Sequence, residues 1–463
     1  MNEISAAHDL AFGASQAPLI ERIADYAVGE RTRDLPGAVL HHSKRSLLDW
    51  FATLLPGTVI PPATMMREAM AEELGHGKAL LYPDAALAPL RLAALINGSA
   101  SHTVEFDDIF KDAIYHPGCP TIAAALAAAQ TQGSTGEQLL RAIIVGYEVS
   151  TRIGAAVSPA HYRFWHTTGT VGCFGSAAAV GTILELDRNQ MMHAIGTVGT
   201  FAAALQQAFR SDSMSKPLHA GRAAEAGALA AMMAKRGVTG ALDILEGEVG
   251  FGAAMADKPD WDGVFADLGG AYNIGRMTFK NHGCCGHCFA AIDATIALRA
   301  AHGLKAAEIR KIRVETYKTA IDVTGRETAR TVFEGRFSLR YTVASALVHG
   351  SVRLNGFTEA RLTDPDVTGL MRRIELAVDP EINAAFPKRR AARVIIETND
   401  GRRLVHDQPH RKGDPDLPLT DSDLSDKFRE LAVPVIGAAR AETLHDAVWS
   451  IDRAGSVDAL AAR

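Results

Sequence analysis

The chain has 463 residues, of which 47% are hydrophobic and 22% charged, and its formal net charge is −5. This length exceeds one ordinary hydrophobic core and predicts two or more domains, and the composition is globular rather than disordered. The weakly negative charge argues against a nucleic-acid partner, which would need a basic surface.

The cysteines and the N-terminal segment indicate where the protein is located. Five cysteines, three of them crowded between residues 284 and 288, make a poor disulfide framework in a chain this long. A reducing compartment suits them better. The N-terminal segment has early acidic residues and no long apolar core, and no stretch approaches ~20 consecutive apolar residues. We therefore expect a cytoplasmic protein with neither a secretory signal nor a membrane span.

Residues 1–270 are rich in Ala, Leu and Met and contain few strand signals. Apolar residues recur at helical spacing in HHSKRSLLDWFATLL, PTIAAALAAAQ and GEQLLRAIIVGYEVSTRIGAAV. The Gly and Ala residues of HTTGTVGCFGSAAAVGTILELD indicate helices that pack backbone to backbone. A further helix, HAGRAAEAGALAAMMAKRGVTG, is expected to close with Gly237 at its C-cap. These features predict an all-α domain.

The pattern changes after about residue 270, where apolar and polar residues alternate as in β-strands. The predicted strands are 309–317, 372–379 and a hairpin over 392–408. The predicted helices are 288–302 and 337–349. We therefore predict a smaller α+β domain over 271–408. The C-terminal segment 409–463 begins with a turn and a helix capped by Thr420 or Ser422, and we expect it to join the helical domain. The predicted fold class is mainly α with a smaller α+β domain.

The segment SHTVEFDDIFKDAIYHPGCP, residues 101–120, places three carboxylates near two imidazoles. The carboxylates are Glu105, Asp107 and Asp108, and the imidazoles are His102 and His116. Both groups are metal ligands, so a metal site is one interpretation. An acid–base pair is a second interpretation, and a solvated loop with helix-capping carboxylates is a third.

Two further segments combine Gly with imidazole or cationic groups. His166 precedes a Thr/Gly stretch that could expose free N–H groups to an anion, although a histidine packed beside Trp165 in the core is the simpler interpretation. Lys216, His219 and Arg222 stand at a helix start, which would suit a bound carboxylate or phosphate. The order of residues is not that of a P-loop. A basic surface helix is the alternative, but cations there oppose the helix dipole, which favours a binding role.

The segment KNHGCCGHCF, residues 280–289, is the densest group of reactive side chains. Cys284, His287 and Cys288 could bind zinc, but no second ligand pair follows at a suitable spacing. A thiol nucleophile such as Cys285 would need a lowered pKa. In the third interpretation His287 lies in the first turn of helix 288–302, where the helix dipole lowers its pKa and leaves a neutral general base. Lys280 and His282 are then secondary candidates for binding a substrate carboxylate.

Taken together and in this order, several segments resemble those of the MmgE/PrpD family. They are KRSLLDWFA, ALINGSASHTVEFDDIF with the later HPG, YEVSTRIG, WHTTGTVGCFGSAAAVG, SMSKPLHAGRAAEAG, GFTEARLTD and KGDPDLPLT. The resemblance implies a large helical domain with an α+β lid domain, a homodimer, and catalysis without a metal or an organic cofactor. Family substrates are small di- and tricarboxylates, and their shared chemistry breaks a bond alpha to a carboxylate.

Carried over by position, the family's pocket corresponds to residues from both predicted domains. They are Glu105, His116, His166, Lys216, His287 and Tyr341. Asp108, Lys280, His219 and Arg222 are further candidates for binding substrate. The sequence differs from the family's usual Asp-Phe-Asp-Asp-Thr motif at Glu105 and Ile109. The spacing from this motif to His116 is one residue longer than in the cis-aconitate decarboxylase of the family. These differences lie where substrate is expected to bind.

The expected function is that of a lyase resembling 2-methylcitrate dehydratase, which abstracts a proton alpha to a carboxylate. Lys216 would stabilise the enediolate-like charge, with His166 as a further donor. His287 or His116 would act as the base, and the other histidine or Tyr341 as the acid. The alternatives are an epimerase of an aminodicarboxylate such as iminodisuccinate, a cis-aconitate-type decarboxylase, a non-catalytic carboxylate-binding dimer, and a zinc hydrolase built on the cysteine segment.

Overall fold

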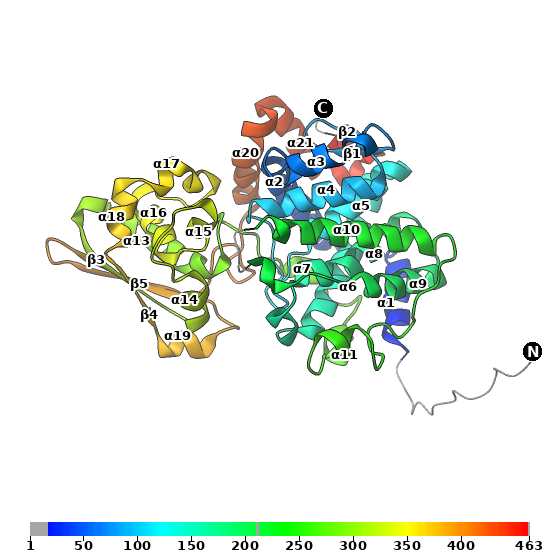
Figure 1. Cartoon of the computed structure of the whole chain (residues 1–463), viewed down its shortest axis with the longest axis horizontal. Coiled ribbons are helices and arrows are strands. Elements are labelled where there is room, and N and C mark those ends of the chain that lie inside the picture. The colour runs from blue at the N-terminus through cyan, green and yellow to red at the C-terminus, as the bar shows by residue number, and fades with distance from the viewer. Residues whose placement is uncertain (1–16, 210–212, 462–463) are drawn as a thin grey trace, which may run out of the picture.

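A computed structural model of the chain describes residues 17–209 and 213–461. These residues form a large helical lobe and a smaller lobe of mixed helices and strands (Figure 1). The fold class predicted from the sequence, mainly α with an α+β part, is thus confirmed. No helix within the described ranges has the length and apolar character needed to cross a membrane.

The large lobe consists of helices from both ends of the described chain. Its longer helices are α1 (Leu19–Gly29), α2 (Gly37–Thr58), α4 (Leu90–Thr103), α5 (Gly118–Gln132), α6 (Gly136–Val157), α8 (Gly172–Ile183), α9 (Arg188–Val198), α10 (Ser215–Ala234), α20 (Asp421–Ile436) and α21 (Ala438–Trp449). Its short elements are α3 (Ala63–Ala69), α7 (Thr167–Thr170), α11 (Phe251–Met255), α12 (Trp261–Phe265) and the antiparallel hairpin β1 (Ala79–Leu81) and β2 (Ala86–Ala88). The hairpin is a local exception to the predicted all-helical character.

Helix α10 lies in close contact with α4 and α8, and glycines make this approach possible. A Cβ added at Gly221 of α10 would lie 2.1 Å from the Leu95 carbonyl oxygen of α4. One added at Gly227 would lie 2.7 Å from the Cys173 carbonyl oxygen of α8. Larger side chains at these positions would push the helices apart. The small-residue packing predicted from the sequence is therefore present, and it fixes the start of α10 beside the loop that follows α4.

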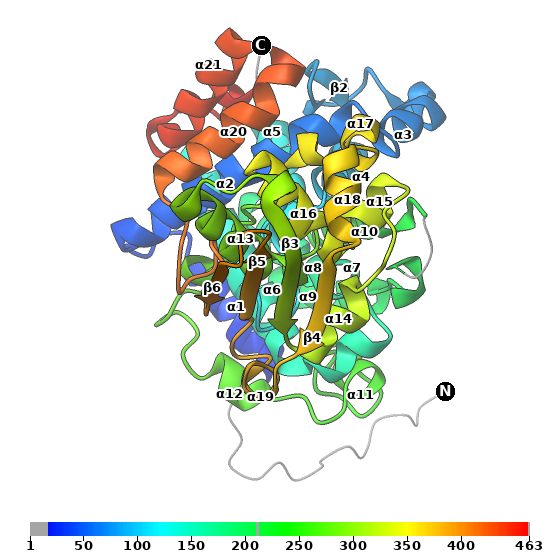
Figure 2. The same cartoon turned by 90° about the vertical axis from the view of Figure 1, so that its left-hand side faces the viewer.

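The smaller lobe contains a four-stranded sheet in the order β4-β3-β5-β6. Its strands are β3 (Ile309–Thr316), β4 (Ile374–Val378), β5 (Ala392–Thr398) and β6 (Arg403–Gln408), and only the β3–β4 pair is parallel. Helices α13 (Phe289–His302) and α16 (Leu339–His349) pack behind the sheet, whose other face points away from the large lobe (Figure 2). The shorter helices are α14 (Lys318–Thr324), α15 (Val332–Arg336), α17 (Glu359–Leu362), α18 (Pro365–Met371) and α19 (Pro380–Ala385).

Most local predictions for this region and the C-terminal segment agree with the structure. The ends of the predicted strands and helices lie within two residues of the ends of β3–β6, α13 and α16. Thr420 caps α20 and accepts a hydrogen bond from the amide of Asp423, so Thr420 rather than Ser422 is the cap. The prediction for Gly237 was wrong in position, because α10 ends at Ala234 and Gly237 lies in the following turn with φ = +92°.

The two lobes have separate hydrophobic cores. One core is built from residues between Leu19 and Phe279 together with residues between Leu419 and Leu460, and the other from residues between Cys284 and Ile396. The chain therefore passes from the first core to the second within the segment 280–283. Helices α20 and α21 return to the large lobe and pack on α2 (Figure 1).

A buried ion pair fixes helix α20 against the loop after α4. The Lys427 ammonium lies 2.6 Å from an Asp49 carboxylate oxygen on α2 and donates to the Phe106 carbonyl oxygen at 2.7 Å. Both side chains of the pair are at most 1% exposed. Because neither charge has access to water, each depends on the other for its solvation. This contact ties the C-terminal helices to the loop that carries Glu105 and Asp107.

We predict that Lys427→Ala lowers the free energy of unfolding of the large lobe by about 3–5 kcal/mol, because it leaves the Asp49 carboxylate buried and unpaired. Arg429→Ala on the same helix is the matched control, since its pair with Glu442 is exposed and screened by water. Urea unfolding midpoints measure both effects. Equal midpoints for the two variants would contradict the role assigned to Lys427.

Candidate active site

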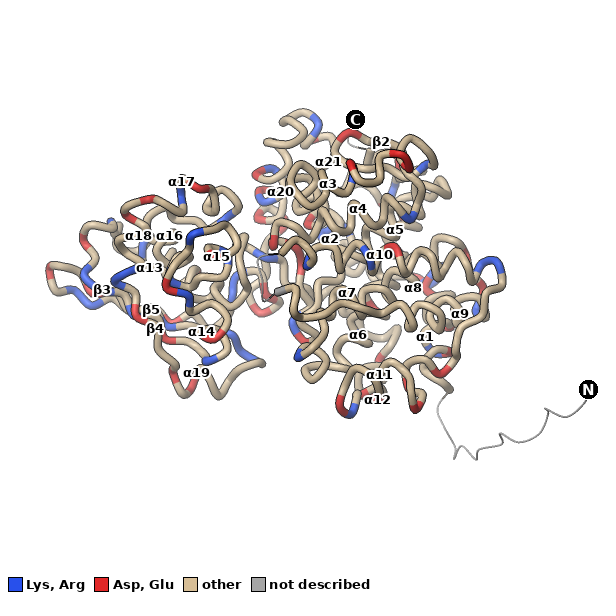
Figure 3. Tube along the Cα trace, in the orientation of Figure 1, with Lys and Arg blue, Asp and Glu red and all other residues tan. Residues whose placement is uncertain are grey.

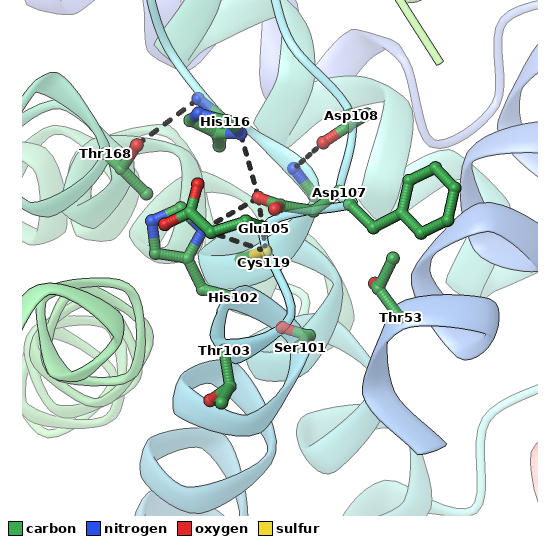
Figure 4. Close-up of polar contacts among 12 residues, drawn as sticks. Thr53, Ser101, His102, Thr103, Glu105, Asp107, Asp108, His116, Cys119 and Thr168 are labelled. Carbon is green, nitrogen blue, oxygen red and sulfur yellow. Dashed lines mark hydrogen bonds and ion pairs between the residues drawn. The ribbon is translucent and has the colours of Figure 1, made fainter. Parts of the chain in front are cut away.

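The loop between α4 and α5, residues 104–117, carries a group of buried polar side chains at the junction of the lobes (Figure 4). Glu105, Asp107 and His116 come from this loop. Lys216 and His219 reach it from the first turns of α10, and His166 is the residue before α7. Lys280 lies on the segment that connects the two cores. The structure thus brings together three of the four segments singled out in the sequence, with Lys280 supplied by the fourth.

Glu105 is enclosed by two ammonium groups. Its carboxylate forms a short ion pair with Lys216, and Lys280 Nζ lies 3.7 Å from its second oxygen. Lys280 also donates to the Glu105 carbonyl oxygen at 2.8 Å. Burial alone would raise the pKa of Glu105, but Lys216 and Lys280 outweigh it and hold that pKa well below its ordinary value. Glu105 has a left-handed backbone with φ = +58°, which is uncommon for a residue other than glycine.

Asp107 links two imidazoles and a thiol. Its Oδ2 atom lies 2.7 Å from His102 Nδ1 and 2.8 Å from His116 Nδ1, and it accepts the Cys119 thiol proton at 3.1 Å. Burial opposes the charge of Asp107, yet His116, His102 and Lys280 hold its pKa well below the ordinary value. Burial lowers the pKa of His116 to about 4, although Asp107 partly offsets this effect. His116 is therefore neutral near pH 7 in the free protein, and Asp107 orients its ring.

A row of four imidazoles extends from this carboxylate to the start of α10. The His102 ring packs at 4.9 Å from the His116 ring and stacks at 5.4 Å on the His166 ring. His166 Nδ1 then lies 3.1 Å from His219 Nδ1. Burial lowers the pKa of His166 well below its ordinary value and that of His219 to about 4. Burial thus leaves His166 and His219 neutral near pH 7, and a hydrogen bond joins their two rings.

Three of these residues also form a donor set that could hold a metal ion. His102, Asp107 and His116 each offer one ligand atom, and these atoms lie within 4.8 Å of one another. Imidazole and carboxylate donors suit a divalent transition metal. The 2.7 Å separation between His102 Nδ1 and Asp107 Oδ2 is equally that of a charge-assisted hydrogen bond. His102 Nε2, Asp107 Oδ1 and His116 Nδ1 are buried without a hydrogen-bond partner in the described part of the chain. Among the residues that the structure describes, Cys284, His287 and Cys288 form no such converging set.

His287 lies in the smaller lobe, in a 3₁₀ turn just before α13. Its Nδ1 atom is 2.7 Å from the Tyr317 hydroxyl, and its ring faces Phe386. Burial, together with the charges of Arg390 and Arg411, lowers its pKa to about 3. It is thus neutral, as predicted, but its polar contact within the structure is with Tyr317 rather than with Glu105 or Lys216.

The cysteines of segment 280–289 are packing residues in this structure. Cys284 and Cys288 are fully buried in the core of the smaller lobe. Cys285 is partly exposed, and burial raises the pKa of its thiol to about 12. Because the thiolate is the reactive form, Cys285 is a poor nucleophile near pH 7. His282 forms a 2.8 Å contact with Asp293 and does not point to the Glu105 cluster.

Besides His287, three further residues predicted for the site do not point to the cluster around Glu105 and Asp107. The Tyr341 hydroxyl is buried in the core of the smaller lobe, where it donates to the Gly356 carbonyl oxygen. Asp108 accepts hydrogen bonds from the Tyr147 hydroxyl and the Gly118 amide behind the loop, and burial raises its pKa to about 8. Arg222 is exposed on α10 and pairs with Glu225. Conversely, the sequence offered His102 and Asp107 only as possible metal ligands or as members of an acid–base pair, and neither was among the residues carried over from the family's pocket.

Comparisons with known proteins divide the chain close to the passage between the two cores, but the second of two family models also covers α20 and α21, which pack in the large lobe. The model of the MmgE/PrpD N-terminal domain matches residues 21–263, and that of the MmgE/PrpD C-terminal domain matches residues 282–453. A cis-aconitate decarboxylase-like protein, oryM, of Aspergillus oryzae is 27% identical over 454 residues and covers 93% of each chain. A cis-aconitate decarboxylase of Aspergillus terreus is 26% identical and covers 96% of each chain. The cis-aconitate decarboxylase of Homo sapiens is 26% identical and covers 94% of this chain and 92% of its own.

Asp107→Asn and Asp108→Asn are both isosteric changes, but we expect them to have different effects on stability at pH 7. Asp107→Asn removes the charge that His102, His116 and Lys280 surround, so we expect a lower urea midpoint at pH 7. Asp108 has a pKa of about 8 and is mostly protonated at pH 7, so Asp108→Asn should cost little stability there. Between about pH 4 and about pH 8 the folded state keeps this proton while the unfolded state releases it. The contribution of Asp108 to the stability of the natural protein therefore falls as the pH rises through this range, and the asparagine variant should gain stability relative to the natural protein. A variant that instead loses relative stability from pH 5 to pH 8 would overturn this assignment.

Proposed function

This chain belongs to the MmgE/PrpD family, and from that premise we propose that it is a lyase of a small tricarboxylate, with decarboxylation as its leading reaction. The observation that supports it most is the pair of ammonium groups, Lys216 and Lys280, on either side of the Glu105 carboxylate, next to a neutral His116. The names of the relatives, which match over more than nine-tenths of their lengths, favour decarboxylation over dehydration.

The proposed reaction places negative charge next to a carboxylate. When the C–C bond to the departing carboxylate breaks, its electron pair stays on the substrate and CO₂ leaves. Conjugation through a neighbouring double bond moves this pair to a carbon alpha to a second carboxylate, in an enediolate-like form. Lys216 and Lys280 stabilise that charge because they are fixed in place and largely removed from water. A proton then adds to the carbon and completes the product.

His116 is the proposed source of that proton. In the free protein its pKa is about 4, so it is neutral near pH 7. A bound tricarboxylate brings negative charge close to the ring and raises this pKa, so the ring takes up a proton from water as the substrate binds. Asp107 then holds the imidazolium in the orientation it needs to donate. The proton balance closes, since decarboxylation consumes one proton for each CO₂ released.

Dehydration is the second candidate, because a neutral His116 can equally remove a proton alpha to a carboxylate. A leaving hydroxyl on the next carbon would then give a reaction like that of 2-methylcitrate dehydratase. Return of the proton to the opposite face would give an epimerase, and binding without turnover would indicate a carboxylate-binding protein. We also propose a cytoplasmic homodimer, as the family resemblance implies. All five cysteines are free, which suits a reducing compartment.

We predict that Lys216→Ala lowers kcat/KM for CO₂ release from cis-aconitate by about 10²–10³, the usual cost of removing one charge-stabilising donor. Arg222→Ala is the matched control, because it lies on the same helix and is exposed. Mass analysis of the products distinguishes CO₂ loss from water loss. A Lys216→Ala enzyme with normal turnover would contradict the proposed mechanism.

We also predict that kcat/KM for decarboxylation falls about tenfold per pH unit above about pH 7, where the carboxylates are fully ionised. The free enzyme must gain a proton on His116 to reach the transition state, and its pKa of about 4 makes that proton scarcer as pH rises. A dehydratase that uses neutral His116 as a base would show a flat profile over this range. Initial rates at low substrate concentration across pH 7–8.5 measure the slope.

A further inference from the structure

Two arginines of the smaller lobe, Arg336 and Arg390, reach across the junction to the loop that carries Glu105. Arg336 Nη1 donates to the Thr103 carbonyl oxygen at 3.4 Å, and Arg390 Nη2 donates to the Lys111 carbonyl oxygen at 3.5 Å. The Thr103 carbonyl group belongs to the last residue of α4, and the Lys111 carbonyl group lies in the middle of the loop. The two arginines therefore contact the chain on either side of Glu105 and Asp107.

Both guanidinium groups have unused hydrogen-bonding capacity. The Nε atom of each is buried and has no hydrogen-bond partner. Each guanidinium also lies over an aromatic ring, 5.7 Å from the Phe357 centroid for Arg336 and 6.0 Å from the Phe386 centroid for Arg390. Burial lowers the pKa of both arginines, and the Glu105 carboxylate partly offsets this effect for Arg336. Since Glu105 is already paired with Lys216, these donors remain available to another anion.

The charges around the loop leave an excess of cations. Lys216 and Lys280 pair with Glu105 and Asp107, and Arg336 lies near Glu105. Arg390 lies near Arg411 and Asp414. His116, His166 and His219 are neutral near pH 7. The Tyr162 phenol lies close enough to both Glu105 and Arg390 for each charge to shift its pKa, Glu105 upward and Arg390 downward. Cys285, which lies near Lys280 and Glu105, donates its amide proton to the Arg336 carbonyl oxygen at 2.9 Å. Basic and acidic residues of both lobes meet at this junction (Figure 3).

We propose that Arg336 and Arg390 bind the carboxylates of the substrate that do not react, and thereby select a tricarboxylate over a dicarboxylate. This inference rests on the proposed function, in which Lys216 and Lys280 stabilise only the reacting part of the substrate. A guanidinium fork matches a carboxylate with two parallel hydrogen bonds, and burial strengthens that pairing. Binding energy from the remote carboxylates then orients the reacting carbon between Lys216 and His116. The bound substrate would also join the two lobes.

Calorimetric titration with two unreactive probes tests this assignment in the full-length protein. The probes are propane-1,2,3-tricarboxylate and glutarate, which is propane-1,3-dicarboxylate. They share the same three-carbon chain with a carboxylate at each end, and they differ only in the carboxylate on the central carbon. We expect Arg336→Gln and Arg390→Gln each to weaken binding of the tricarboxylate by about 10–100-fold, the usual range for a hydrogen bond to a charged group. Binding of glutarate should change by no more than about threefold, because the lysines suffice for two carboxylates.

Arg389→Gln is the matched control, since Arg389 is exposed beside Arg390 and should leave both affinities unchanged. Arg336→Lys keeps the charge and loses the fork, so it should fold normally and bind the tricarboxylate with intermediate affinity. If the arginine variants weaken both probes equally, or neither, the arginines only hold the lobes together and the inference fails while the proposed function stands. If the natural protein binds neither probe, the proposed function fails, and the inference with it.

Discussion

The burial of two carboxylates in one short loop is the constraint on which the rest of the structure depends. Glu105 and Asp107 are enclosed at the junction of the lobes, where ionised groups are costly without partners. Cations therefore have to come from distant parts of the chain. Lys216 comes from α10 and Lys280 from the segment between the cores, while Lys427 of α20 holds the loop backbone through the Phe106 carbonyl group. The packing of α10 and α20 beside this loop places Lys216 and Lys427 within reach of it.

The same constraint gives the site its chemical character. Burial leaves His116, His166 and His219 neutral in the free protein, because it favours the uncharged imidazole. An anionic substrate changes that balance and draws a proton onto His116, which couples binding to the protonation that the reaction consumes. The left-handed backbone at Glu105 is a strained feature at the centre of the site, and strain of this kind is tolerated where the surroundings fix a residue in position. Binding, charge stabilisation and proton transfer thus rest on one loop.

Much of this architecture could be predicted from the sequence, because periodicity reports which face of an element is buried. The change from helical to alternating spacing predicted a smaller domain from residue 271, whereas the core of the smaller lobe begins at Cys284. Small residues in α8 and α10 indicated close helix packing. Side-chain direction within the 104–117 loop could not be predicted. With φ = +58° at Glu105, the loop turns Asp107 toward the histidines and leaves Asp108 facing Tyr147. Spacing alone does not encode such a turn.

The positions of residues that depend on long-range packing could not be predicted from the sequence either. Arg336 closes a short helix and Arg390 follows a turn, and neither stands in a motif that distinguishes it from the exposed arginines nearby. Tyr341 lies on the first turn of α16, but the helix rotates it into the core of the smaller lobe, where it contacts Phe357. His287 is close to the junction in sequence and yet pairs with Tyr317. Such positions depend on how the two lobes meet, which local patterns do not specify.

A crystal structure of the protein with propane-1,2,3-tricarboxylate bound tests the central claim most directly. The account predicts one molecule at the 104–117 loop, with a carboxylate on Lys216 and another on Arg336, and with His116 beside the central carbon. Ligand bound instead in the pocket lined by His282, Arg353 and Lys412, with the loop unchanged, would contradict it.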